Sequence, residues 1–215
     1  MGMFMLEFIK NEINAIYSFL KRNYPEVAVF CLAALFLVLD EYHPLSPRWL
    51  SSLVYFAVLP LLTISIILRK NPLDFGFRLG NWKIWGFHVI LSLVITIPVL
   101  YISSRFTSLE AYYTQEEFNL LIYSLETIVY MFAWEFLYRG FLLFGLKEKL
   151  GEISIFVQMI PFVLLHFGKP EIETISTILA GIYLGYVVYR GGSYWPAFII
   201  HVVVNIWFRI VVNLL

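Results

Sequence analysis

Long apolar runs recur along the chain from about residue 27 to the C-terminus, and only short charged loops separate them. A helix needs roughly 20 mainly apolar residues to cross a bilayer, and only helices or closed barrels satisfy their backbone groups in lipid. The pattern therefore predicts an all-α, polytopic bundle of transmembrane helices. We expect about seven spans, over residues 26–39, 49–68, 84–101, 118–146, 153–167, 172–189 and 195–214. The first and fifth are short for a full crossing.

The composition fits one membrane-embedded domain over residues 1–215. Charged residues make up 14% of the chain, against about 25% in a soluble domain. Residues 1–22 carry apolar side chains at helical spacing, interrupted by Glu7 and Glu12. This segment predicts an interfacial amphipathic helix rather than a cleaved signal peptide, whereas residues 118–214 form the core that carries the polar motifs. The net charge of zero argues against nucleic acid as a partner.

Lysine and arginine are unevenly divided between the two sets of loops. Ten of the 15 lie in the N-terminal segment and in the loops that follow the second, fourth and sixth spans, whereas Arg48, Arg105 and Lys169 lie in the other set. Because loops rich in lysine and arginine stay in the cytoplasm, we expect the N-terminus there, in a cytoplasmic membrane.

Four polar residues interrupt the apolar stretches of three separate spans: Glu135, His166, His201 and Asn205. Ionisable side chains in lipid cost several kcal/mol or more, so they usually face a protein interior or a watery cavity. Counted inward from the expected span ends at about 1.5 Å per residue, all four lie roughly 10–20 Å below the cytoplasmic face. They are therefore expected to meet in one layer of the bundle.

The residue types in this layer favour hydrolysis of a peptide bond. Glu135 and a histidine could hold a water and take its proton, while His201 and Asn205 could donate hydrogen bonds to the oxyanion. Arg139, four residues after Glu135, shares its helix face. A weaker alternative is a zinc ion held by Glu135, His166 and His201, although their spacing lacks the compact helix motif. A proton-coupled transporter is a third alternative, but no repeated halves are visible.

Three ordered motifs resemble those of the CPBP family of intramembrane proteases, which includes CAAX prenyl endopeptidases and bacteriocin-processing or immunity proteins. They are Trp134-Glu135-Phe-Leu-Tyr-Arg139, Phe162-Val-Leu-Leu-His166 and His201-Val-Val-Val-Asn205. The resemblance implies a prokaryotic intramembrane endopeptidase without a cofactor, acting on a membrane-embedded or membrane-anchored substrate. It also implies that His166 helps to activate water, that His201 and Asn205 stabilise the oxyanion, and that Arg139 positions the glutamate.

One position departs from the family pattern. The first motif usually begins with two glutamates, of which the first is the water-activating base, but here that position is Trp134. An indole donates a hydrogen bond and accepts no proton. Adjacent helical residues point about 100° apart, so Glu135 would take over the base role only at some structural cost. The alternative is a non-catalytic membrane binding or scaffold protein.

Overall fold

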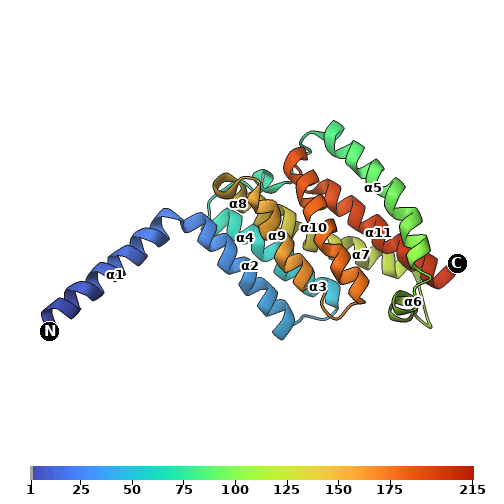
Figure 1. The fold of residues 1–215 in the computed structure, drawn as a ribbon, viewed down its shortest axis with the longest axis horizontal. Helices are drawn as coiled ribbons and strands as arrows, with labels where there is room; N and C mark the ends of the chain where they lie inside the picture. Colours follow the sequence, from blue (N-terminus) through green and yellow to red (C-terminus); the bar gives the residue numbers. More distant parts are fainter. Residues whose placement is uncertain (1) are drawn as a thin grey trace.

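The computed structural model describes residues 2–215, which fold into helices joined by short turns (Figure 1). The prediction of an all-α bundle is confirmed. The elements are α1 (Gly2–Arg22), α2 (Tyr24–Tyr42), α3 (Arg48–Leu53), η1 (Val54–Val58), α4 (Leu59–Leu62), η2 (Thr63–Ile67), η3 (Pro72–Phe75), α5 (Trp82–Ser103), α6 (Thr107–Tyr113), α7 (Leu120–Glu135), η4 (Phe136–Leu142), α8 (Leu143–Leu150), α9 (Ile153–Leu164), α10 (Glu171–Gly191) and α11 (Trp195–Leu214).

Five helical segments within residues 2–215 are long and apolar enough to cross a membrane. They are 48–67, 82–103, 120–150, 171–191 and 195–214. The pair α1–α2 counts as a sixth only if its two helices, bent by 86°, form one broken span. The fifth expected span is α9, which has 12 residues. The count of five or six is close to the expected count of about seven. The two segments that do not qualify by themselves, residues 26–39 and 153–167, are the two that the sequence predicts to be short.

Helix α1 leaves the bundle and extends away from it (Figure 1). Its apolar side chains are largely exposed, including Phe4 and Phe8 at 78% and 57%. The 86° bend would place α1 along the membrane plane if α2 follows the membrane normal. Its interfacial location stays a prediction.

The loops rich in lysine and arginine gather at one end of the bundle, which we call the basic end (residues 68–81, 147–152 and 190–195). Lys70 pairs with Glu148 at 2.8 Å, and Lys147 Nζ donates to the Tyr189 carbonyl at 3.2 Å. We call the opposite end, formed by residues 104–119, 165–170 and the last turn of α11, the α6 end. There the Gln115 backbone N–H donates to Asn213 Oδ1 at 2.8 Å.

The longest helical segment, 120–150, is interrupted by the π-helical turn η4. A π-turn widens the helix by one residue, and such turns are frequent at functional sites. Glu135 is the last residue before this turn and Arg139 lies within it. Gly140 follows, and its backbone is so close to the Phe136 ring and the Phe75 carbonyl that a Cβ would not fit. All residues of the turn are buried, and there is no room for a side chain at Gly140.

Candidate active site

Glu135 is the centre of a buried ion pair that joins two helices. Glu135 is fully buried. Its Oε1 accepts a hydrogen bond from Arg139 Nη1 of η4 at 3.0 Å and another from His201 Nδ1 of α11 at 2.6 Å. Charge-assisted bonds of this kind are roughly twice as strong as neutral ones. Within residues 2–215, Glu135 Oε2 has no hydrogen-bond partner. The predicted pairing of Glu135 with Arg139 is present, and the carboxylate also orients a histidine of α11.

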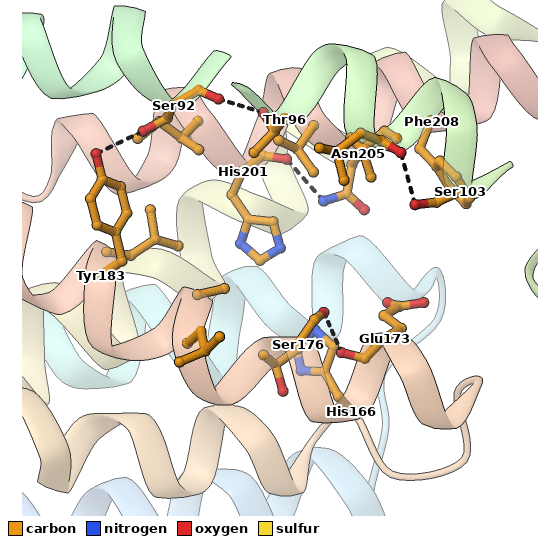
Figure 2. Close-up of a pocket in the computed structure, with 18 of the residues that line it drawn as sticks. Ser92, Thr96, Ser103, His166, Glu173, Ser176, Tyr183, His201, Asn205 and Phe208 are labelled. Atoms are coloured by element: carbon orange, nitrogen blue, oxygen red, sulfur yellow. Dashed lines mark hydrogen bonds between the residues drawn. The ribbon is translucent and has the colours of Figure 1, made fainter. Parts of the chain in front are cut away.

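His201 projects from α11 into a cavity (Figure 2). A carboxylate only accepts, so the proton of a neutral imidazole sits on Nδ1 and Nε2 keeps its lone pair. The side chain is 12% exposed, whereas Glu135 is at 0% and is not among the residues that line the cavity. His201 therefore presents a basic nitrogen to the cavity, with a carboxylate behind it.

His166 reaches the same cavity from the turn between α9 and α10. Its Nδ1 lies 2.7 Å from the Phe162 carbonyl oxygen, and since a carbonyl only accepts, Nδ1 is the donor and Nε2 is uncommitted. Thr174 Oγ1 donates to the His166 carbonyl at 2.8 Å and ties the turn to α10. Figure 2 shows His166 and His201 on opposite walls.

Phe162 packs among the ionisable groups of the site. The Arg139 guanidinium lies 4.1 Å from its ring centroid, which is a cation–π geometry. The His166 ring lies at 4.7 Å and the His201 ring at 5.8 Å, both edge-on. One aromatic ring thus fixes the Arg139 side chain and both imidazoles relative to one another.

Asn205 lies one turn after His201 and also lines the cavity. Its Nδ2 donates to the His201 carbonyl at 2.9 Å and makes a long contact of 4.0 Å with Met131 Sδ. A thioether is a weak acceptor. One amide hydrogen can therefore turn to a substrate oxygen at little cost.

Trp134 points away from the cavity toward α3. Its Nε1 donates to Ser52 Oγ at 3.2 Å, and its ring packs on Tyr130 at 4.8 Å and on Phe56 at 6.0 Å. The indole also meets the His166 ring edge-on at 6.4 Å. The space beside His166 is thus occupied by an indole and not by a carboxylate. Residue 134 therefore supplies no group that could accept a proton next to His166.

The cavity has a volume of about 660 Å³ and lies between α5, α10 and α11, with α6 and the end of α9 closing parts of its wall. Its lining is mostly apolar. Lys169 and Glu173 are the charged side chains among the described lining residues, and neither belongs to a motif that marks a site in the sequence. Ser92 and Tyr183 also line the cavity. The sequence gives no signal for them, because a single hydroxyl in an apolar helix is not part of a recognisable motif.

Zinc was the weaker alternative from the sequence. Within residues 2–215, no group of three or more His, Cys, Asp or Glu side chains is arranged to hold a metal ion. Glu135 Oε1 is bonded to both Arg139 and His201, and Glu135 does not line the cavity that His166 and His201 face. These three side chains do not form a ligand set in this structure.

Residues 116–207 match the family model described as type II CAAX prenyl endopeptidase Rce1-like. The matched segment is less than half of the chain and contains all three polar motifs. It confirms the resemblance to CPBP-family intramembrane proteases. Among curated proteins and solved structures, no match to the chain is found.

Proposed function

We propose that this membrane protein is an intramembrane endopeptidase in which His201, held by Glu135, activates the water that cleaves a membrane-associated substrate. The observation that carries the proposal is the 2.6 Å contact between Glu135 Oε1 and His201 Nδ1, at the wall of a cavity that also contains His166 and Asn205. A buried carboxylate that orients a histidine is the arrangement by which proteases stabilise an imidazolium during acyl transfer.

The proton path follows from the hydrogen bonds of the two histidines, because Nδ1 of each ring is already bonded and only Nε2 is free to accept a proton. A water in the cavity would give one proton to His201 Nε2 as its oxygen attacks the scissile carbonyl, and the imidazolium would gain stability from the anionic Glu135. The same proton would then pass to the leaving amine nitrogen as the C–N bond breaks. His166 Nε2, which is also an acceptor, would hold the second hydrogen of the water and so orient its lone pair. Glu135 acts through His201 and not on the water itself.

In this arrangement Asn205 is the residue that would donate a hydrogen bond to the oxyanion. With Nδ1–H committed to Glu135, neutral His201 has no further donor, which favours the base role over the oxyanion role expected from the family resemblance. The Asn205 amide has a hydrogen held only by the weak contact to Met131. Removing one such donor from an oxyanion site typically lowers kcat by about 10²–10³-fold.

The test is cleavage of membrane-anchored fluorogenic peptides by the full-length protein reconstituted in lipid. His201→Ala should abolish cleavage, whereas His43→Ala should leave it unchanged, because His43 is exposed and lies outside the cavity lining. Activity in His201→Ala equal to wild type would refute the proposed base. Loss of wild-type activity on chelation would shift the mechanism to a metal ion.

A second candidate function is a non-catalytic binding or scaffold protein. The observation that favours it is the packing of Trp134 against His166 and Ser52, which puts an indole where the family pattern has its base. Here the cavity would hold a partner segment without cleaving it. Trp134→Glu distinguishes the two: activity that appears only in this variant supports the binding protein, and activity already present in wild type excludes it.

A further inference from the structure

Three side chains outside the sequence motifs form a polar cluster where α5 and α10 meet at the cavity. Tyr183 OH lies 3.2 Å from Ser92 Oγ and 3.2 Å from His88 Nδ1. Ser92 and Tyr183 line the cavity, and Figure 2 shows the Tyr183 side chain reaching from α10 toward Ser92 on α5. The proposed proton path uses none of these three residues.

The cluster lies at the level of His201. Helices α5 and α11 lie side by side and run in the same direction (Figure 1), and Trp207 Nε1 of α11 donates to the Ile97 carbonyl of α5 at 3.0 Å. Five residues before these partners, about 7.5 Å toward the start of each helix, are Ser92 and Val202. Ser92 is therefore level with the residue that follows His201.

Apolar packing supports the same level. The immediate sequence neighbours of Ser92, Tyr183 and His201 belong to one apolar cluster, and they are Leu93, Leu184 and Ile200. Asn205 lies four residues after His201 on α11, roughly 6 Å further along the helix. Figure 2 shows Tyr183 and Asn205 on opposite sides of His201. A peptide held at His201 would thus have polar groups of the protein on both sides.

The hydrogens of the α5 hydroxyl groups are already used within α5. Ser92 Oγ donates to the His88 carbonyl at 2.6 Å, and Thr96 Oγ1 donates to the Ser92 carbonyl at 2.8 Å. Because a serine hydroxyl has one hydrogen, Ser92 is left as an acceptor toward Tyr183. The Tyr183 oxygen keeps at least one lone pair whether His88 Nδ1 accepts or donates. A group in the cavity can therefore donate a hydrogen bond to the Tyr183 oxygen.

A peptide substrate brings donors of this kind into the cavity. A helical segment pairs its own backbone N–H groups, but a peptide bond that is open to attack has unwound neighbours, whose N–H groups need other partners. Burying an N–H group without a partner in apolar surroundings is costly. The lining around Tyr183 is largely apolar, with Ile95 and Leu184 among its residues, so an acceptor there favours an unwound peptide.

We infer that the Tyr183 oxygen accepts a hydrogen bond from a backbone N–H of the substrate, close to the bond on which His201 and Asn205 act. The inference rests on the proposed function, which supplies the peptide substrate. Ser92 and His88 hold the phenol in place, and the apolar lining suits apolar side chains. The substrate is then an apolar peptide segment that is unwound where it meets Tyr183, since an intact helix has no N–H group to spare.

The test is a binding measurement with a palmitoylated, fluorophore-labelled peptide of leucine and alanine residues as the probe. In a set of analogues, one backbone N–H at a time is replaced by an ester oxygen, which removes a single donor. Dissociation constants are measured by fluorescence anisotropy on the full chain in lipid nanodiscs, with empty nanodiscs as the background. Every protein carries His201→Ala, so that the probe is bound and not cleaved.

Tyr183→Phe should weaken binding of the all-amide probe by about 5- to 50-fold, because a buried N–H then loses its acceptor. For one ester analogue, which lacks that N–H, the same substitution should change Kd by less than about twofold, since two changes at one contact are not additive. Tyr186→Phe is the matched control and should leave Kd unchanged. Tyr186 lies on the same helix, is 41% exposed and does not line the cavity.

Ser92→Ala separates contact with the substrate from the packing of α5 on α10. It removes a neighbour of Tyr183 but keeps the Tyr183 oxygen, so the same ester position should remain the sensitive one. An unchanged Kd in Tyr183→Phe, or equal weakening for the all-amide probe and every ester analogue, would overturn the inference even if the wild type cleaves the probe. The expected ester pattern without cleavage by the wild type would support the inference and refute the proposed function.

Discussion

Replacement of Glu135 by glutamine removes the anion behind His201 while keeping the size of the side chain. The imidazolium that forms when His201 takes a proton would lose its charge partner at 2.6 Å. Loss of the equivalent carboxylate in serine proteases lowers kcat by about 10⁴-fold, and this corresponds to roughly 5.5 kcal/mol of transition-state stabilisation. Because Glu135 is fully buried and does not line the cavity, KM should change little.

The same substitution also leaves Arg139 as an unpaired buried cation. Removing one partner of such a pair typically costs about 3–5 kcal/mol of stability, so a loss of activity alone would be ambiguous. The double variant Glu135→Gln/Arg139→Met removes both charges and should recover much of the thermal stability in detergent without recovering kcat. Steady-state cleavage of a membrane-anchored peptide and thermal unfolding are measured on the same preparations.

The reasoning would be refuted if folded Glu135→Gln kept kcat within about threefold of wild type, because Glu135 would then stabilise the fold and contribute nothing to the transition state. It would equally be refuted if the double variant recovered activity together with stability.

Three further changes test the packing and the oxyanion site. Asn205→Ala should lower kcat by about 10²–10³-fold with little change in KM, since the lost amide would act in the transition state; a rise in KM alone would assign it to substrate binding. Phe162→Ala should cost about 3–5 kcal/mol of stability, because it removes a buried ring and the cation–π contact to Arg139, and thermal unfolding should show it. Gly185→Leu should destabilise by about 1–3 kcal/mol through overpacking, since even a Cβ at this position would lie 2.5 Å from Gln158 Nε2; an unchanged unfolding temperature would contradict this packing.

Much of the candidate site was predictable because helical spacing determines which residues share a face. Glu135 and Arg139 are four residues apart and pair as expected. The depths counted from the span ends also predicted that residues of three separate spans lie in one layer. The 100° step between adjacent residues also separates Trp134 from Glu135: the indole donates to Ser52 while the carboxylate binds His201. The individual catalytic roles remain predictions.

Other features could not be read from the sequence. The π-turn η4 depends on close packing around Gly140, and a 3.6-residue pattern does not reveal it. The contact between Glu135 and His201 depends on how α11 crosses α7, which no local signal encodes. In the sequence, Lys169 is a charged loop residue and Glu173 is a charged residue at the start of a helix. Their position at the cavity depends on how α6 and α10 pack together, which the sequence does not show.

The limits of the span prediction have a physical cause. Hydropathy detects apolar length and not direction, so the bend between α1 and α2 is invisible to it. Helix α9 is apolar but ends after 12 residues, where the chain turns at His166. Ile155 and Phe162 on one face of α9 are buried, whereas Phe156, Ile160 and Leu164 on the other face are exposed. The helix is therefore apolar on both faces but too short to cross a bilayer.

Cleavage of a membrane-anchored peptide in water enriched in oxygen-18, followed by mass spectrometry of the N-terminal product, tests the central claim most directly. The account predicts one oxygen-18 atom in the new carboxylate for wild type and for His43→Ala, and no product for His201→Ala. Absence of a labelled product from wild type, or an equal yield from His201→Ala, would contradict the claim that His201 and Glu135 activate water for peptide hydrolysis.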